Sequence, residues 1–239
     1  MSELKRPKRG LFVTGTDTGV GKTYVAALIA RALVADGHRV GVYKPVASGC
    51  WREGDQLYSD DADALWAAAG NPGEPDRVCP QRFEEPLAPH LAARAEGKQV
   101  DESLLREGLE YWGDQCDVII VEGAGGLMSP VSEEDYVADL AFEFGYPLVV
   151  VSPNVLGVIN QTLQTLITAA TFRDGIHVAG VVLNNMSESS RLSEDPSVQT
   201  NRRELELRCV PPVLGEVYWD TDQFESDVNW WDLAQEPAR

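Results

Sequence analysis

The stretch from residue 10 to residue 33 constrains the fold more than any other part of the sequence. It begins with the apolar run GLFVTG, continues through the glycine-rich segment GTDTGVGKT, and ends in a run with helical periodicity. One face of that helix carries Val25, Leu28, Ile29, Ala32 and Leu33. An unbroken apolar strand is typical of a parallel sheet that helices cover on both faces. The stretch therefore predicts a strand, a glycine-rich turn and a helix of an α/β fold.

Further apolar runs supply the rest of the predicted sheet. They cover residues 39–45, 117–123, 147–152, 178–184 and 211–217. Segments with helical periodicity separate them, and residues 158–172 are the clearest example. This alternation predicts a mostly parallel sheet with helices on both faces, in one domain over residues 1–239.

Three segments have the composition of loops. They cover residues 50–58, the proline-rich 71–90, and 186–200, which is rich in Ser and Glu. An acidic tail follows from about residue 218. We expect its tryptophans to pack as anchors of the tail, namely Trp219, Trp230 and Trp231.

The balance of charge excludes several kinds of partner. Lys and Arg number 20 against 38 Asp and Glu, which gives a formal net charge of -18, the opposite of a nucleic-acid-binding surface.

The cysteines form no CxxC pair, so neither a zinc site nor a disulfide framework is predicted. No apolar run has the length needed to cross a bilayer, and the basic start does not lead into a secretory signal. We expect a soluble, cytoplasmic protein without a nucleic-acid or membrane partner.

The glycine-rich segment predicts a phosphate-binding loop. The backbone amides of residues 19–23 can converge on phosphate oxygens at the positive end of a helix. Lys22 adds a full charge, and Thr23 adds a hydroxyl for Mg²⁺. The alternative is a glycine-rich turn before an ordinary helix with an exposed lysine.

The spacing of this loop is unusual. The common pattern G-x-x-x-x-G-K-[ST] requires glycine at position 16, but the chain has Thr16, with Gly15 one residue earlier. Asp17 stands where the loops of partitioning ATPases carry a second lysine. The loop therefore belongs to a narrower group of phosphate-binding proteins.

A carboxylate that could bind Mg²⁺ ends the predicted strand 117–123. Glu122 is costly to bury without a cation, and the glycines after it allow a ligand to approach the backbone closely. The alternative is an acid that reaches solvent. A predicted helix starts with Asp60, Asp61 and Asp63. Each of these could bind the metal, but each could instead cap the helix and interact with its dipole.

A second lysine ends the predicted strand 39–45. Lys44 is placed to stabilise charge that develops during phosphoryl transfer, and Ser48 follows it in the next turn. The alternative is a surface lysine before a proline turn.

Six motifs, taken together, resemble dethiobiotin synthetase, the ATP-dependent ligase of biotin biosynthesis. They are GTDTGVGKT, YKPVASG, FEEPLAPHLAARAEG, VEGAGG, LGVIN and GVVLNN, in this order. The resemblance extends from about residue 11 to residue 219, and the lengthened phosphate loop is a trait of that family. It implies a P-loop fold, a homodimer, and closure of a ureido ring from 7,8-diaminononanoate, CO₂ and ATP.

The implied reaction has three steps. One amine captures CO₂ as a carbamate, the carbamate oxygen attacks the γ-phosphate, and the second amine displaces phosphate from the resulting mixed anhydride. Such a reaction depends mainly on positioning and charge stabilisation.

The resemblance also assigns roles to residues. Lys44 and Lys22 are implied as catalytic, and Thr18 and Ser48 join Lys44 in binding substrate. Asp61 matches the family's D-A-x-A-L motif, and the implied Mg²⁺ ligands are Thr23, Asp61 and Glu122. The implied nucleotide site comprises Gly19, Val20, Gly21, Lys22, Thr23, Tyr24, Asp61, Glu122, Gly123, Ala124, Gly125, Asn184, Asn185, Tyr218 and Trp219.

Asn184 is implied to read the adenine, with capping of the turn after the strand as its structural alternative. The chain departs from the family at Gly19, where some members carry glutamate, and at Tyr218, where proline is frequent. Asn185 falls where aspartate also occurs.

Three other functions compete with this interpretation. A cobyrinate synthase of the same P-loop branch would need a glutaminase domain, for which the chain has no room. A partition-type ATPase switch that binds a protein partner would need the lysine that Asp17 replaces. A nucleotide-binding regulator without turnover would carry the same phosphate loop.

Overall fold

The sheet at the centre of the molecule has six parallel strands. The computed structural model describes residues 6–186 and 196–235. Within these residues the strand order is β2-β5-β1-β6-β7-β8, and every neighbouring pair is parallel. The strands are β1 Gly10–Gly15, β2 Val40–Tyr43, β5 Val118–Gly126, β6 Leu148–Pro153, β7 Val178–Asn184 and β8 Val213–Val217. The predicted runs of residues are thus confirmed as strands, with ends that differ by up to three residues.

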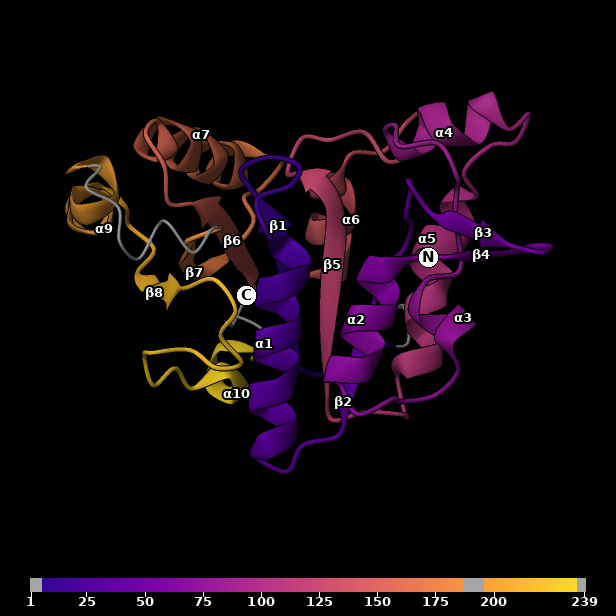
Figure 1. Cartoon of the computed structure of the whole chain (residues 1–239), viewed down its shortest axis with the longest axis horizontal. Helices are drawn as coiled ribbons and strands as arrows, with labels where there is room; N and C mark the ends of the chain where they lie inside the picture. The colour runs from indigo at the N-terminus through magenta and orange to yellow at the C-terminus, as the bar shows by residue number, and fades with distance from the viewer. Residues whose placement is uncertain (1–5, 187–195, 236–239) are drawn as a thin grey trace.

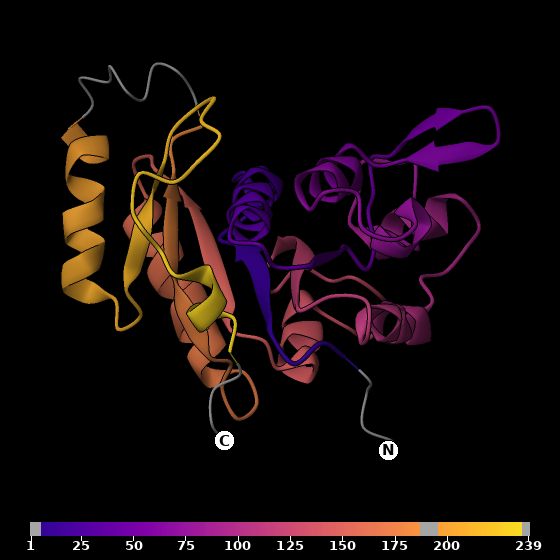
Figure 2. The same cartoon turned by 90° about the horizontal axis from the view of Figure 1, so that it is seen from below.

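Helices cover both faces of this sheet. In Figure 1 the helices α1 and α2 lie in front of the strands and α6 lies behind them, and Figure 2 shows α1 and α7 on opposite sides. Because both faces are covered, Leu11, Phe12 and Val13 of β1 are fully buried. The helices are α1 Lys22–Ala35, α2 Asp60–Ala68, α3 Pro75–Val78, α4 Pro89–Ala95, α5 Glu102–Glu107, the 3₁₀ helix η1 Gly108–Trp112, α6 Val137–Phe144, α7 Val158–Thr171, α9 Pro196–Arg208 and α10 Trp230–Leu233. The predicted fold class is confirmed.

The prediction of a loop at residues 50–58 is wrong. This segment forms a hairpin of β3 Trp51–Glu53 and β4 Gln56–Tyr58, with Gly54 at a φ of +61° in the turn. The rings of Trp51 and Tyr58 stack across it at a centroid distance of 4.7 Å. Charged and polar residues dominate the segment, so its strands carry no apolar signal.

Two other predicted loops contain helices. Residues 71–90 include α3 and the start of α4, both of which begin with a proline in the first helical turn. In the segment 186–200, residues 187–195 lie outside the described residues, and residues 196–200 form the start of α9. The inner face of α9 buries only Asn201 and Leu205, which is too little apolar periodicity to reveal a helix.

The tail packs on α1 and on the start of β1. Trp230 is 2% exposed, and Trp231 stacks on His38 at a centroid distance of 4.0 Å. These two tryptophans are anchors, as predicted. For Trp219 the prediction of an anchor is wrong, because 55% of that residue is exposed.

No helix in the described ranges combines the length and the apolar character needed to span a bilayer.

Candidate active site

The glycine-rich segment forms the turn from β1 to α1, at the carboxyl edge of the sheet. Gly19 and Gly21 have φ values of +74° and +88°, which only glycine adopts without strain. Gly21 caps α1, and the first amides of a helix have no partner within the helix, so they can bind an anion. A side chain at Gly21 would not fit, because its Cβ would lie 2.0 Å from Nδ2 of Asn184.

Lys22 is buried beside this turn. It is 7% exposed, and its Nζ donates to the carbonyl oxygen of Asp17 at 3.0 Å. Burial lowers the pKa of Lys22 below its ordinary value, although nearby carboxylates, Glu122 foremost, act in the opposite direction. The alternative of an exposed lysine after the turn is therefore wrong.

Lys44 lies between the two predicted carboxylates. Its Nζ is 2.7 Å from Oε1 of Glu122 and 2.8 Å from Oδ2 of Asp61. The pairing of β2 with β5 brings the lysine and the glutamate together, and Asp61 comes from the first turn of α2. Lys44 is 3% exposed and Glu122 is 1% exposed. Both surface alternatives, a solvent-facing lysine and a glutamate that reaches water, are wrong.

The aspartates at the start of α2 have different partners. Ser59 caps the helix by accepting the amide of Ala62 at 3.3 Å. Asp60 accepts the indole N–H of Trp51 at 2.8 Å, whereas Asp61 pairs with Lys44. Of these acids, the structure pairs Asp61 with Lys44, beside the phosphate loop.

Thr23 completes the cluster of oxygen donors. Its hydroxyl donates to Oε1 of Glu122 at 2.9 Å, while Oε2 of Glu122 is buried and has no hydrogen-bond partner in the described part of the chain. Within residues 6–186 and 196–235 no group of three or more His, Cys, Asp or Glu side chains is arranged to hold a metal alone. Mg²⁺ bound to a nucleotide takes one or two carboxylates and completes its shell with phosphate oxygens and water. Thr23, Asp61 and Glu122 fit such an ion.

Burial and charge move the pKa values of this cluster. Burial acts to lower the pKa of Lys44, but Glu122 and Asp61 outweigh it and raise that pKa above its ordinary value. Burial raises the pKa of Glu122, whereas Lys44 acts to lower it. Asp61 has a lowered pKa because Lys44 outweighs its partial desolvation. The ammonium of Lys44 therefore stays charged between its two partners.

The glycines after Glu122 are required by packing. A Cβ at Gly123 would lie 2.7 Å from Val137, and one at Gly125 would lie 2.4 Å from Oγ of Ser129. Ser129 also accepts the amide of Gly126 at 2.8 Å. The Thr18 hydroxyl lies 3.4 Å from the same Cβ position at Gly125, so the phosphate loop and the end of β5 are in contact.

Ser48 is half-buried in the segment that follows Lys44. Its neighbours Ala47 and Gly49 donate their amides to the carbonyl oxygens of Gln81 and Glu85, at 2.9 and 3.1 Å. The side chain of Ser48 has no hydrogen bond to Lys44 among the described residues. This predicted substrate residue is linked to the site only by its place in the sequence, four residues after Lys44.

A pocket of about 380 Å³ lies on the other side of the phosphate loop. Three segments contribute to its wall: the phosphate loop with the start of α1, the end of β7, and the turn after β8. Its lining residues are Gly19, Gly21, Tyr24, Asn184, Asn185, Met186, Trp219 and Asp220. Met186 and Asp220 were not predicted; each directly follows predicted residues, so only the limits of the motif were missed. Tyr218 turns its hydroxyl toward Glu216, at 3.4 Å.

Asn184 links this pocket to the phosphate loop. Its amide nitrogen donates to the carbonyl oxygen of Val20 at 2.9 Å, and the residue is 4% exposed. This contact replaces the predicted alternative of a cap on its own turn. The amide oxygen takes no hydrogen bond within the described residues, so it is available as an acceptor at the pocket.

Three buried asparagines support the far wall of the pocket. The amide of Asn201 on α9 donates to Asn154 at 2.9 Å, and the amide of Asn154 donates to Asn185 at 3.0 Å. The amide of Asn185 then reaches the carbonyl oxygen of Val217 at 3.2 Å. The ends of β6, β7 and β8 are thereby fixed to one another and to α9. No spacing in the sequence marks this chain of amides, since its members come from distant segments.

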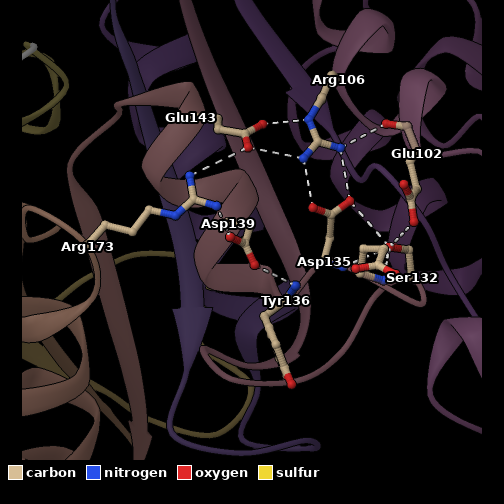
Figure 3. Close-up of polar contacts among 9 residues, drawn as sticks. Glu102, Arg106, Ser132, Asp135, Tyr136, Asp139, Glu143 and Arg173 are labelled. Atoms are coloured by element: carbon tan, nitrogen blue, oxygen red, sulfur yellow. Dashed lines mark hydrogen bonds and ion pairs between the residues drawn. The ribbon is translucent and has the colours of Figure 1, made fainter.

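An ion-pair network holds the loop that follows Glu122 (Figure 3). Arg106 on α5 donates to both oxygens of Asp135, at 2.8 and 3.0 Å, and to Glu143 on α6 at 2.5 Å. Arg173 pairs with Asp139, which also caps the start of α6. Residues of α5 and α6, with Arg173 from the turn after α7, thus clamp the loop between β5 and α6.

Comparison with known proteins identifies relatives over most of the chain. The family model of an AAA domain matches residues 9–224. The chain is 45% identical over 217 residues to an ATP-dependent dethiobiotin synthetase of Rhodopirellula baltica, which covers 86% of this chain and 82% of the relative. It is 39% identical over 214 residues to one of Anaeromyxobacter dehalogenans, with 90% and 92% of the two chains covered.

Solved structures share the fold at low sequence identity. A ParA family ATPase of Chlorobium tepidum aligns with a TM-score of 0.53 at 18% identity, over 90% of this chain and 85% of that chain. A protein of Borrelia burgdorferi described as a plasmid partition protein, solved with AMPPNP, aligns with a TM-score of 0.55 at 10% identity, over 96% and 95%. These two likenesses concern the arrangement of the sheet and helices alone.

Proposed function

The chain belongs to the family of ATP-dependent dethiobiotin synthetases, and we propose that Lys44, Lys22 and the residues around them carry out the family's reaction in this protein. The enzyme is a ligase that forms carbon–nitrogen bonds at the expense of ATP. Its substrates are 7,8-diaminononanoate, CO₂ and ATP, and its products are dethiobiotin, ADP and phosphate. The contact of Lys44 with both Asp61 and Glu122, beside the phosphate loop, is the observation that carries this assignment.

The phosphate loop binds the triphosphate. The amides at the start of α1 face the phosphate oxygens, and the ammonium of Lys22 bridges the phosphates and the carbamate, where it stabilises the negative charge on the phosphoryl group being transferred. Lys22 now donates to a carbonyl oxygen of its own loop. A phosphate oxygen is a stronger acceptor for an ammonium than that carbonyl, so ATP binding shifts Lys22 onto the nucleotide.

Lys44 holds the reacting carbamate. One amine of the diaminononanoate takes up CO₂ and forms a C–N bond, losing a proton. The carbamate oxygen then attacks the γ-phosphorus while the bond to the β-phosphate oxygen breaks, giving ADP and a mixed anhydride. The second amine attacks the anhydride carbon and loses a proton, and phosphate leaves. A fixed ammonium beside these oxygens stabilises the negative charge in each step.

Thr23, Asp61 and Glu122 are the residues that would hold Mg²⁺. The ion would neutralise charge on the β- and γ-phosphates when it is bound with the nucleotide. Both carboxylates are now paired to Lys44. The second oxygen of Glu122 has no partner among residues 6–186 and 196–235, which leaves a buried acceptor available for a cation.

The pocket beside Tyr24 and Asn184 is proposed to hold the adenosine. Its volume of about 380 Å³ lies in the range of small-molecule sites. Thr18, Ser48 and Lys44 are proposed to contact the diaminononanoate, on the other side of the phosphate loop. The remaining nucleotide contacts come from the segment 122–125 and from Tyr218.

A homodimer is proposed from the apolar residues exposed after β5 and β6. Met128, Tyr136, Val155 and Leu156 are 45%, 42%, 44% and 83% exposed. They belong to loops at the carboxyl edge of neighbouring parts of the sheet, where a second copy would cover them. Light scattering measures the mass: a dimer is expected, and Leu156→Asp is expected to shift it toward the monomer.

A cytoplasmic location is proposed from the cysteines. All four are unpaired, and Cys50, Cys79 and Cys116 are buried. Such thiols are typical of a reducing compartment.

The decisive experiment supplies all substrates together. The protein is incubated with Mg-ATP, bicarbonate and 7,8-diaminononanoate, and dethiobiotin and ADP are quantified by mass spectrometry and chromatography. One dethiobiotin is expected for each ADP. Hydrolysis of ATP without a cyclic urea would contradict the proposal.

A further inference from the structure

Tyr24 lines the proposed nucleotide pocket and contacts the turn after β8. It directly follows Thr23 in the first turn of α1, and its half-buried side chain forms part of the pocket wall. Another part of the wall is made by Trp219 and Asp220, which lie in an irregular turn after β8. The hydroxyl of Tyr24 connects these two parts of the wall through Thr221, which is 197 residues away in the sequence.

The hydroxyl is the centre of the turn at residues 218–221. It accepts the amide of Thr221 at 2.6 Å and donates to the carbonyl oxygen of Thr221 at 2.5 Å. The carbonyl oxygen of Tyr218 lies 3.3 Å away. Backbone groups in an irregular segment need partners as much as those in a sheet, and here one side chain of α1 supplies them.

The turn is also held at its start and within itself. Its start is held by β8, where the amide of Asn185 donates to the carbonyl oxygen of Val217 at 2.8 Å. Asp220 has a φ of +56°, in the left-handed region that non-glycine residues rarely adopt. Trp219 is 55% exposed, so packing alone does not fix its ring. Within the turn, the Thr221 hydroxyl donates to the carbonyl oxygen of Tyr218 at 3.1 Å. The hydroxyl of Tyr24 ties this turn to α1, so the position of Trp219 and Asp220 against the phosphate loop depends on it.

We propose that Tyr24 is a positioning residue for nucleobase recognition, whose hydroxyl holds the wall formed by Trp219 and Asp220 against the phosphate loop. This role rests on the proposed function, in which the base of ATP occupies this pocket. The phosphate contacts come from backbone amides and Lys22, which the hydroxyl does not touch. Base binding and triphosphate binding are therefore separable by a change at Tyr24.

The test is the variant Tyr24→Phe, which keeps the ring in the pocket wall and removes only the hydroxyl. The KM for ATP is expected to rise about three- to tenfold with little change in kcat, as for the loss of one or two hydrogen bonds. Inhibition by inorganic triphosphate is expected to stay the same. The ratio of kcat/KM for ATP to that for UTP is expected to fall, because the wall that contacts the base is loosened.

Tyr146→Phe is the matched control. Its hydroxyl donates to the carbonyl oxygen of Pro7 at 2.8 Å, and Tyr146 does not line the pocket, so the loss of this hydroxyl is expected to leave the KM for ATP within about twofold. Trp219→Ala removes the wall itself and keeps the hydroxyl. It is expected to reproduce the effect of Tyr24→Phe, and it provides the test if Tyr24→Phe does not fold.

Two results for Tyr24→Phe would overturn the proposal. One is an unchanged KM for ATP and unchanged discrimination against UTP. The other is an equal loss of affinity for ATP and for inorganic triphosphate, which would place the effect in the phosphate loop. A wild-type protein that binds triphosphate as tightly as ATP would instead contradict the base site, and the proposal with it.

Discussion

At the scale of single residues, the site is organised by charges that have been removed from water. Lys44 and Glu122 are both almost fully buried, and each is the principal partner of the other. A buried charge whose partner is removed is far more costly than an exposed one. Substitutions here are therefore expected to act on both chemistry and stability, and the two effects need separate measurements.

Lys44→Ala is expected to lower kcat by about 100-fold or more, because it removes the ammonium that we propose to hold the carbamate. Binding of ATP is expected to persist, since the phosphate loop is intact. Steady-state kinetics and calorimetric titration with a nonhydrolysable ATP analogue measure the two quantities. Lys98→Ala is the control, because that lysine is exposed and pairs with Glu96 on the surface. Loss of nucleotide binding with normal turnover of the bound fraction would show that Lys44 serves the nucleotide alone.

Asn184 predicts a preference for bases that carry an amino group. Its amide nitrogen is committed to Val20, which leaves the oxygen as the group that can meet the base. Adenine offers a donor there, whereas hypoxanthine offers an acceptor. The KM for ITP is therefore expected to exceed that for ATP by about tenfold, as for an unpaired polar contact. Equal KM values for the two nucleotides would show that Asn184 does not read the base.

At the scale of elements, the loops at the carboxyl edge depend on helices that contribute nothing to the chemistry. The loop after β5 is clamped by Arg106 and its acidic partners, and the loop after β6 is tied to α9 through Asn154 and Asn201. A parallel sheet brings the ends of its strands together, but it does not fix the loops that follow them. These polar networks supply that order.

Arg106→Gln is expected to lower the free energy of unfolding by roughly 1–3 kcal/mol, since it leaves partly buried carboxylates without a charged donor. Arg94→Gln is the matched control, because its ion pair with Glu133 is exposed and is expected to contribute less than about 1 kcal/mol. Urea unfolding followed by circular dichroism measures both variants. Equal effects of the two substitutions would contradict a structural role for the network shown in Figure 3.

The ion pair of Arg106 with Asp135 predicts that the stability of the protein depends on pH. Arg106 lowers the pKa of Asp135, so the folded state holds that carboxyl ionised more strongly than the unfolded state does. The stabilisation is complete above the ordinary aspartate pKa of about 3.9 and is lost as the pH falls through the lowered value. The difference between the wild type and Arg106→Gln is expected to be constant from pH 7 to 5 and to shrink toward pH 3.

The sequence predicts some elements of this molecule well and others poorly, for physical reasons. Strands buried on both faces leave continuous apolar runs, and β1 was predicted with its observed ends. The hairpin at Trp51 and Tyr58 leaves no such run, because charged and polar residues separate its few apolar ones. In the site, the GKT turn and Glu122 in β5 were predicted from local pattern, whereas choosing Asp61 over Asp60 required the family resemblance. The asparagine chain was missed because contacts between distant segments have no local signature.

At the scale of the whole molecule, one apolar core extends from the sheet to the tail. Buried residues from β1 to α10, including Leu11, Trp112 and Trp230, belong to a single contiguous cluster. We therefore propose that the chain is one domain that unfolds as a unit.

Heating is expected to produce a single transition with the same midpoint by circular dichroism and by tryptophan fluorescence. Mg-ATP at about 100 times its Kd is expected to stabilise the protein by about 2.7 kcal/mol, or by roughly 5–10 °C in Tm for a chain of this length. Lys22→Ala is expected to abolish most of that shift. Two separate transitions would contradict the single domain, and an equal shift in Lys22→Ala would place the nucleotide elsewhere.

The two ends of the described chain meet. Arg9 and Gln235 form an isolated bridge, and the amide of Gly10 donates to the carbonyl oxygen of Ala234 at 2.9 Å. This junction lies at the amino end of β1, whereas the phosphate loop lies at its carboxyl end. The connectivity is thus almost that of a ring. A circularly permuted enzyme, with its old ends joined by a short linker and new ends opened at the exposed turn of Gly54, would retain every strand neighbour of the native sheet.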